Sequence, residues 1–149
     1  MQKILFFLTF IILSSTTKAQ SAEDSVKAVI NKLFAAFKNS DAISMKSTFA
    51  DNAIMQTFLI KDGTTVIENE TVEEFAKNIS RIPKGDADEQ IVFDVIKING
   101  PLAMVWAPYK FYYKGTFSHC GVDSFQLVKI NGEWKIQYLV DTRTKTGCN

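Results

Sequence analysis

His119 and Asp123 are the residues with which this sequence could perform acid–base chemistry or orient a bound molecule. His119 is the single histidine of the chain, and Asp123 follows four positions later in a run that predicts a strand. Positions four apart in a regular strand share a face but lie about 13 Å apart, at ~3.3 Å per residue. We therefore expect each group to reach a common ligand or water from its own depth in a pocket. The alternative is that His119 lies at an open rim and Asp123 satisfies a buried backbone group or hydroxyl.

Metal and nucleophile chemistry has less support in these residue types. A zinc site built from His119, Cys120 and Cys148 would need a fourth ligand and would compete with a disulfide. His119 and Cys120 are adjacent and point to opposite faces of a regular strand, which also argues against a Cys–His nucleophile. The sequence contains neither a Gly-x-Ser-x-Gly elbow nor a phosphate-cradling glycine loop. We predict no metal and no cofactor.

Residues 1–20 have the order of a secretory signal peptide. Lys3 supplies a positive charge, an apolar run follows over residues 4–13, and the remainder is small or polar. The run is shorter than the roughly 20 apolar residues that cross a bilayer, and we prefer a signal peptide to a buried N-terminal helix. We expect cleavage near residue 20, which leaves residues 21–149 as one exported domain, periplasmic or secreted, with no membrane association.

Composition and cysteine count describe this domain further. The full chain has 17 basic and 16 acidic residues, and this near-neutral balance gives no electrostatic case for a nucleic-acid partner or an anionic membrane. Its 12 phenylalanines argue against disorder. Cys120 and Cys148 form an even pair, so a disulfide is the default hypothesis in an oxidising compartment, provided that their Cα atoms come within about 7 Å. Two free thiols are the alternative.

Apolar periodicity and turn signals divide the chain into helices and strands. Apolar residues recur at three- and four-residue steps through 21–39, which predicts a helix, and a short helix follows Asp41. Thr71 and Glu74 form a capping box ahead of a third helix that stops before Pro83. β-branched and aromatic runs predict strands at residues 53–60, 64–69, 91–98, 102–113, 116–130 and 133–142. This order predicts an α+β fold with helices on one face of an antiparallel sheet.

Turn chemistry sets the expected register of the last three strands. If Lys114-Gly115 and Asn131-Gly132 are two-residue hairpin turns, the residues that flank each turn pair across it. Directly opposed residues share a face, so His119 and Asp123 join the more apolar face, which should pack on the helices. Its other members are Leu102, Met104, Trp106, Lys110, Phe125, Leu127, Trp134, Ile136, Tyr138 and Val140. The opposite face collects Ala103, Val105, Ala107, Ser124, Gln126, Lys135, Gln137 and Asp141.

Pro108 weakens this register, because proline lacks the ladder donor and tends to mark an edge or a bulge. A bulge there would turn Tyr109 inward and Lys110 outward. Tyr109 therefore stays among the candidate site residues.

Several runs in the second half carry a family resemblance: Trp106-Ala-Pro-Tyr109, Ser118-His-Cys-Gly-Val-Asp-Ser-Phe125, Gly132-Glu-Trp134-Lys-Ile136 and Asp141-Thr-Arg143. With the order of helices and strands, these runs resemble the nuclear transport factor 2-like (NTF2-like) superfamily. Within it, the chain looks most like the small exported proteins of the putative lumazine-binding and SnoaL-like families. The resemblance covers essentially all of residues 21–149, and its more specific part is His-Cys-Gly-Val-Asp ahead of an apolar strand.

The resemblance implies a cone-shaped fold, in which a strongly curved antiparallel or mixed sheet wraps around about three helices from the N-terminal half. It also implies a pocket at the open end of the cone and a homodimer. Function does not follow from the fold, because similar folds serve as isomerases, dehydratases, epoxide hydrolases, polyketide cyclases, transport factors and ligand carriers.

Three functions remain open at this point. The first is a ligand-binding carrier or sensor whose pocket takes a small, flat, aromatic or partly apolar molecule. His119, Asp123 and Tyr109 would orient that ligand, and aromatic side chains would line the pocket, namely Phe58, Phe75, Trp106, Phe125 and Tyr138. The second is an isomerase, dehydratase or hydrolase in which Asp123 or His119 is the general base. The third is a dimeric interaction protein with a filled cavity, so the sequence does not decide whether the chain is an enzyme.

Overall fold

Three helices precede most of the sheet, and each begins where its capping residue predicts. The computed structural model describes residues 21–148; the predicted signal peptide lies outside them. The helices are α1 (Ala22–Lys38), α2 (Ala42–Lys46) and α3 (Val72–Ile79). The Ser21 hydroxyl accepts the Asp24 N–H at 3.0 Å, and the Asp41 carboxylate caps α2 in the same way. At α3 the Thr71–Glu74 capping box is present in both directions. No helix of the described part is long and apolar enough to cross a membrane.

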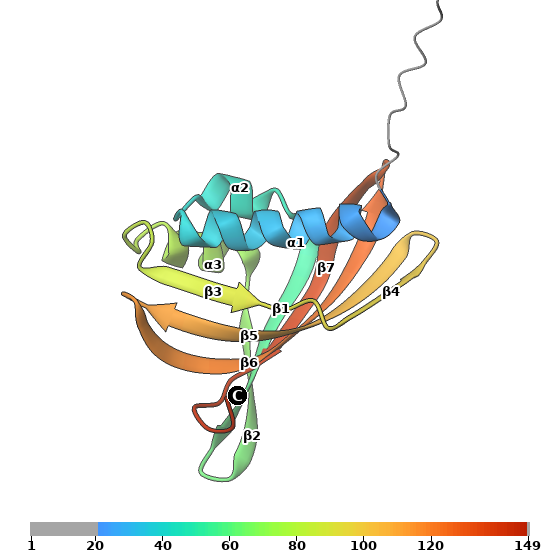
Figure 1. The fold of residues 1–149 in the computed structure, drawn as a ribbon. Coiled ribbons are helices and arrows are strands. Elements are labelled where there is room, and N and C mark those ends of the chain that lie inside the picture. The colour runs from blue at the N-terminus through green and yellow to red at the C-terminus, as the bar shows by residue number, and fades with distance from the viewer. Residues whose placement is uncertain (1–20, 149) are drawn as a thin grey trace, which may run out of the picture.

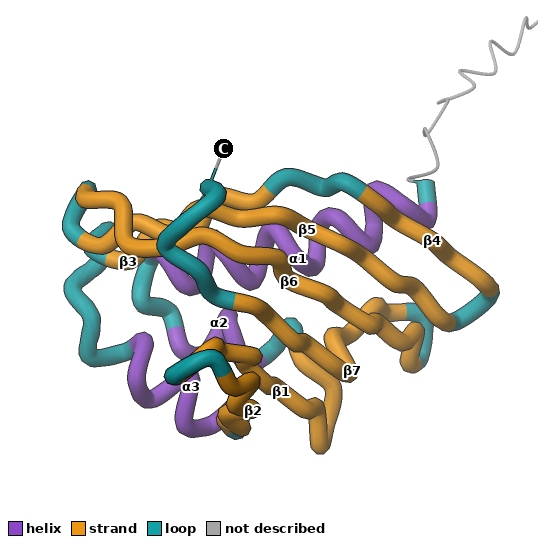
Figure 2. Tube along the Cα trace, turned by 90° about the horizontal axis from the view of Figure 1, so that it is seen from below, coloured by secondary structure: helices purple, strands orange, loops and turns teal. Residues whose placement is uncertain are grey.

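The strands form one mixed, strongly curved sheet (Figure 1). Its order is β2-β1-β7-β6-β5-β3, and β4 also pairs with β5. β1 and β7 are parallel, whereas every other neighbouring pair is antiparallel. Seen from below in Figure 2, β7 lies between β1 and β6. The strands are β1 (Phe49–Lys61), β2 (Thr64–Glu70), β3 (Ala87–Ile91), β4 (Val95–Asn99), β5 (Leu102–Tyr113), β6 (Thr116–Ile130) and β7 (Glu133–Thr142).

The strand expected over 91–98 is wrong in its extent, because the structure divides this region into β3 and β4. Both pair with β5, and residues 92–94 carry the chain from one to the other. β3 begins at Ala87, four residues before the strand expected from residue 91. The early start of β3 places Glu89 in the sheet, opposite Phe111.

The helices cover the concave face of the sheet, and the core lies between the two layers (Figure 1). α1 contributes its buried stripe at three- and four-residue steps, as the sequence predicts. The fully buried side chains of the sheet come from alternate positions, as a pleated strand requires. Members of this core include Val26, Ile30, Leu33, Met45, Ile79, Val105, Phe125, Leu127 and Ile136.

The two hairpin turns are confirmed, since Tyr113 pairs with Thr116 and Ile130 with Glu133. The first residue of each turn, Lys114 or Asn131, has a positive φ and is followed by a glycine that also has one. This is the backbone of a two-residue turn that matches the twist of the strands.

A bulge in β6 overturns the predicted faces of β5. Tyr112 pairs with Phe117 but Phe111 pairs with His119, so Ser118 is an extra residue. Beyond this point every β5 residue faces the opposite way from the prediction. Leu102, Met104 and Trp106 lie on the outer face, where Trp106 is 43% exposed. The inward orientation predicted for these three side chains, and for Lys110 in the same set, is wrong.

A second bulge, at Gln137 in β7, reverses the end of that strand. Leu127 pairs with Ile136, whereas Gln126 pairs with Tyr138. Tyr138 and Val140 therefore lie on the outer face and Asp141 on the inner face, each opposite to the prediction. Trp134 and Ile136 precede the bulge and are buried as predicted.

Tyr109 is inward and only 3% exposed. Its orientation agrees with the alternative that Pro108 suggested, but the bulge that produces it lies at Ser118 on the facing strand. Cys120 of β6 and Cys148 form the predicted disulfide, with a Cα–Cα distance of 5.8 Å. The bridge holds the segment after β7 against β6, where Cys120 and Thr144 exchange two backbone hydrogen bonds of 2.9 Å.

Candidate functional site

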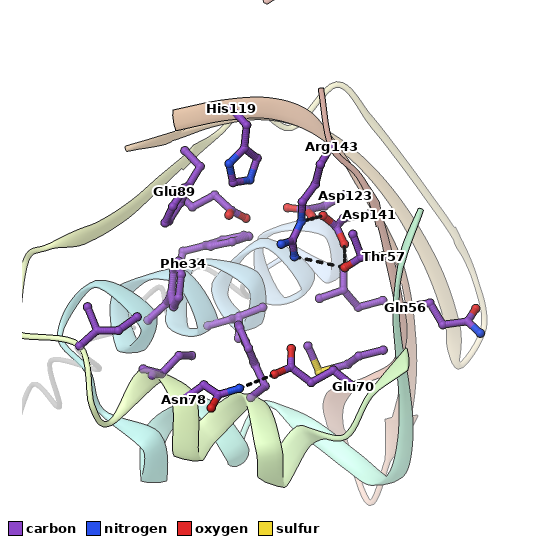
Figure 3. A pocket seen from close by; sticks show the side chains of 18 residues that line it. Phe34, Gln56, Thr57, Glu70, Asn78, Glu89, His119, Asp123, Asp141 and Arg143 are labelled. Atoms are coloured by element: carbon purple, nitrogen blue, oxygen red, sulfur yellow. Dashed lines mark hydrogen bonds and ion pairs between the residues drawn. The ribbon is translucent and has the colours of Figure 1, made fainter. Parts of the chain in front are cut away.

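A cavity of about 260 Å³ lies between α1, α3 and the concave face of the sheet (Figure 3). Its walls combine an aromatic side with a cluster of ionisable groups at one end. The lining residues are Leu33, Phe34, Phe37, Met55, Gln56, Thr57, Glu70, Phe75, Asn78, Ile79, Ile82, Glu89, Phe111, His119, Asp123, Leu139, Asp141 and Arg143.

Four phenylalanines supply the aromatic side. Phe34 and Phe37 come from α1, Phe75 from α3 and Phe111 from β5. The Phe37 ring lies 5.7 Å from that of Phe75 and 5.9 Å from that of Phe111, each with an interplanar angle of 30°. These near-parallel rings form a flat apolar wall of the cavity.

Asp141 is the most heavily hydrogen-bonded carboxyl of the ionisable cluster. Arg143 donates from Nε to Asp141 Oδ2 at 2.8 Å, and its Nη2 donates to the Thr57 hydroxyl at 3.1 Å. The Thr57 hydroxyl in turn donates to Asp141 Oδ1 at 2.5 Å. Tyr109 donates to Asp141 Oδ2 at 3.2 Å and to the Thr142 carbonyl at 2.9 Å. Burial raises the pKa of Tyr109, so its hydroxyl stays protonated and acts as a donor.

Asp123 and Glu89 have no comparable set of hydrogen-bond donors. Asp123 is 3% exposed, and no donor of the described chain satisfies its buried Oδ2. Burial first, and the neighbouring Glu89 second, raise the pKa of Asp123 well above its usual range. Burial, followed by the charge of Asp141, raises the pKa of Glu89 to about 7. Because each carboxyl group raises the cost of ionising its neighbour, the Glu89–Asp123 pair shares a proton near neutral pH.

His119 lies at the same end of the cavity, close to Glu89 and Arg143 in Figure 3. Its ring centroid is 5.0 Å from Phe111, and its Nδ1 is 3.0 Å from the Ser118 hydroxyl. Burial, together with the charge of Arg143, lowers the pKa of His119. The imidazole is therefore neutral near pH 7 and can donate or accept one hydrogen bond.

A smaller polar pair faces this cluster across the cavity. Asn78 of α3 donates from Nδ2 to Glu70 Oε1 at 2.8 Å (Figure 3). Gln56, although it lines the cavity, directs its amide away from it in the same view and accepts a hydrogen bond from Tyr138. The polar groups that this side of the cavity presents are therefore those of Glu70 and Asn78.

The structure brings some of the predicted site residues together and separates the others. His119, Asp123 and Phe75 line the cavity, and Tyr109 lies directly behind Asp141. The remaining four predicted residues do not line it: Phe125 is buried in the core, Trp106 and Tyr138 lie on the outer face, and Phe58 pairs with Ile67 in the β1–β2 hairpin.

Sequence reasoning missed Glu89, Asp141 and Arg143. The bulge at Gln137 concealed Asp141, because no proline or glycine marks it. Arg143 lies just beyond β7 and shares the Asp141-Thr-Arg143 run that contributed to the family resemblance. The alternation of Ala87, Glu89 and Ile91 with polar neighbours could have indicated the strand that carries Glu89.

Within residues 21–148, no group of three or more histidine, cysteine, aspartate and glutamate side chains is arranged to hold a metal ion.

Residues 21–138 match a protein family described as putative lumazine-binding. No curated protein matches the chain significantly. Among solved structures, an NTF2-like protein of unknown function from Shewanella baltica OS155 is 18% identical with a TM-score of 0.65, over 87% of this chain and 98% of that one. A domain of unknown function with a cystatin-like fold from Nostoc punctiforme PCC 73102 is 19% identical with a TM-score of 0.66, over 89% and 82%. These similarities confirm the predicted NTF2-like α+β fold.

Proposed function

The chain belongs to the putative lumazine-binding family, and from that premise we propose that it is an exported NTF2-like protein that binds a small, flat, partly apolar molecule. The ligand occupies the cavity between α1, α3 and the concave sheet. One observation carries the proposal: phenylalanine rings from three elements meet a compact set of hydrogen-bonding groups in a single cavity. Mostly apolar walls with few convergent polar groups are typical of small-molecule sites.

The volume of the cavity limits the size of the ligand. A volume of about 260 Å³ lies just below the ~300–1,000 Å³ of ordinary ligand pockets, which favours a compact molecule of one or two rings. Phe34, Phe37 and Phe111 would contact its faces, while Asp123, Glu89 and His119 would fix its orientation. The open volume also favours this function over an interaction protein whose cavity is filled by its own side chains.

The test combines ligand discovery with two matched variants. Mass spectrometry of molecules that co-purify with the folded protein identifies candidates, and calorimetry measures their affinity, with lumazine included as a flat heterocyclic probe. Phe37→Ala should weaken binding about tenfold or more, because it removes one aromatic face. Phe117→Ala removes the same side chain from an exposed site outside the cavity and should leave affinity unchanged. Equal effects of the two variants would contradict a ligand in this cavity.

Export and self-association complete the proposal. The N-terminal charge and apolar pattern and the Cys120–Cys148 disulfide support delivery to the periplasm or the medium. Recovery of mature protein that begins near Ser21 outside the cytoplasm tests this. A homodimer is supported by the apolar side chains that β5 exposes on the outer face, including Leu102, Met104 and Trp106.

A second candidate function, proton transfer by an enzyme of the isomerase, dehydratase or hydrolase type, is favoured by one specific observation. The Glu89–Asp123 pair shares a proton inside the cavity, and Glu89 has a pKa of about 7, which suits a general acid or base near neutral pH. Panels of ketone, enol and epoxide substrates test this with Asp123→Asn and His119→Ala. Turnover that both substitutions abolish while binding persists supports the enzyme. Absence of turnover with the wild type rejects it and leaves the binding function.

A further inference from the structure

We infer that the ligand presents a basic or N–H-donating nitrogen group, such as an amidine, a guanidine or an amino-substituted heterocycle, to the carboxyl groups of Glu89 and Asp123. This inference rests on the proposed function, because it specifies the chemical class of the molecule that occupies the same cavity.

Glu89 and Asp123 are neighbouring carboxyl groups that receive no hydrogen bond from a donor of the described chain other than the proton that they share. Asp123 is 3% exposed and lines the cavity, yet no donor within residues 21–148 satisfies its Oδ2. Glu89 lines the same end and forms no ion pair with any cation of the described chain. A buried carboxyl oxygen without a donor is costly, and a ligand N–H at this position would satisfy it.

The groups that surround this pair determine the charge that a ligand meets. The ionisable ones are His119 from β6, Tyr109 from β5, Asp141 near the end of β7 and Arg143 just beyond that strand. Across the cavity only Glu70 is ionisable, and α1 contributes apolar side chains. The end of the cavity thus holds three carboxyl groups and one guanidinium, and that guanidinium is already bonded to Asp141 and Thr57.

This excess of carboxyl groups favours a cationic ligand over an anionic one. An anionic ligand would meet the three carboxyl groups, and the one guanidinium nearby already forms an ion pair with Asp141. A cationic ligand would replace the proton that Glu89 and Asp123 share, and would pair with a negative charge that has no partner in the protein. Charge-assisted hydrogen bonds of this kind are roughly twice as strong as neutral ones.

The aromatic side of the cavity adjoins this pair through Phe111. Phe34 and Phe111 line the same cavity as Glu89 and Asp123, and Phe111 pairs directly with both Glu89 and His119 in the sheet. A planar nitrogen group on a flat ring can therefore meet the carboxyl groups while the ring contacts phenylalanine. An aliphatic amine would make the first contact without the second.

Three probes with the same ring and different charge test the inference: benzamidine as a cation, benzamide as its neutral counterpart and benzoate as an anion. Calorimetry at pH 7.5 should give benzamidine about tenfold or more higher affinity than benzamide, with benzoate weakest. Amide chemical-shift changes at β3 and β6 locate the site. Benzamidine affinity should increase from pH 6 to pH 8 as the carboxyl pair loses its proton, whereas benzamide affinity should not.

Variants assign the effect to the carboxyl groups. Glu89→Gln and Asp123→Asn should each reduce the preference for benzamidine over benzamide at least about fivefold, while Glu133→Gln, an exposed turn residue, should not. If Asp123→Asn does not fold, Glu89→Gln still carries the test. Benzamide or benzoate binding as tightly as benzamidine overturns this inference but leaves a small-molecule site. If none of the three probes nor any co-purified molecule binds, the proposed function fails and the inference fails with it.

Discussion

Asp123 and Asp141 pair directly across β6 and β7, yet their carboxyl groups are supported in opposite ways. Asp141 accepts hydrogen bonds from Arg143, Thr57 and Tyr109. Asp123 has only the carboxyl of Glu89, with which it shares a proton. Two aspartates at paired sheet positions thus differ in hydrogen bonding within one cavity: Asp141 has three side-chain donors, and Asp123 has none from the described chain.

The first prediction concerns stability against pH. The pKa values of Asp123 and Glu89 are raised on folding, that of Glu89 from 4.5 to about 7, so the folded state binds more protons than the unfolded state above about pH 4.5. The free energy of unfolding should therefore fall as pH rises from about 5 to 7.5, by on the order of 2–3 kcal/mol. Calorimetric melting across this range measures it. The double substitution Glu89→Gln with Asp123→Asn should flatten the slope, and a wild-type melting temperature that increases over the range would contradict the assignment.

Arg143→Met should raise the pKa of Glu89 above about 7, because the guanidinium charge lowers that pKa in the wild type. Asp141 would also lose its ion pair, at a cost of about 1 kcal/mol given the partial exposure of Arg143. Carbon-detected NMR titration of the glutamate carboxyl groups follows the first effect and urea unfolding the second. Arg81→Met, at an exposed arginine without an ion pair in the described chain, is the matched control. A Glu89 pKa that falls or does not move would refute the coupling.

Removal of the disulfide should loosen the segment that carries Arg143. Cys120→Ser with Cys148→Ser opens a loop whose ends are separated by 28 positions, which predicts a loss of about 3–4 kcal/mol in the free energy of unfolding. Hydrogen exchange at the Thr144 amide, which bonds to the Cys120 carbonyl, should accelerate more than exchange in α1. Uniform acceleration of both would mean that the bridge acts on global stability alone.

Gly121→Ala should be severely destabilising. A Cβ at this position would lie 1.7 Å from the Thr142 carbonyl oxygen and 2.9 Å from Cε1 of Tyr109. The backbone at the end of β7 cannot stay in place, so we expect the free energy of unfolding to fall by about 3 kcal/mol or more, measured by urea unfolding. Gly100→Ala has open space around its Cβ and tests the cost of backbone strain alone, since its φ is +58°. A larger loss at Gly100 would show that contact at Gly121 is not the decisive factor.

Trp106→Glu should convert the proposed homodimer to a monomer, because it places a charge at the centre of the apolar outer face of β5. Light scattering coupled to size-exclusion chromatography measures the mass. Ile43→Glu introduces the same charge on α2, at a side chain that is 81% exposed, and should leave the dimer intact. A wild-type mass equal to one chain at micromolar concentration would contradict the homodimer.

Local signals predicted the elements of this fold well. Ser21, Asp41 and Thr71 begin helices because their side chains satisfy backbone donors within three residues. Lys114-Gly115 and Asn131-Gly132 form their turns for similarly local reasons. Features decided by neighbours within four residues can be inferred from sequence alone.

The bulges at Ser118 and Gln137 could not be inferred in this way. Neither residue type favours a bulge, and each bulge accommodates the curvature of a sheet whose partners are distant in sequence. A shift of one residue reverses every side chain beyond it. His119 and Asp123 were placed correctly because both lie on the same strand beyond its bulge, whereas Trp106, Tyr138 and Asp141 were each assigned to the wrong face.

The parallel pairing of β1 with β7 also limits when the sheet and its cavity can form during folding. Thr57 and Asp141 are hydrogen-bonded across 84 positions of sequence, and β7 separates β1 from β6. Before β7 has folded, the β1–β2 hairpin cannot pair with the rest of the sheet. The Thr57 hydroxyl likewise lacks its hydrogen-bond acceptor, the Asp141 carboxylate. A chain that emerges on the far side of a membrane N-terminus first would therefore expose the apolar stripe of α1 and an unpaired β1 throughout its passage. The cavity is therefore complete only when β7 and the residues that directly follow it are in place.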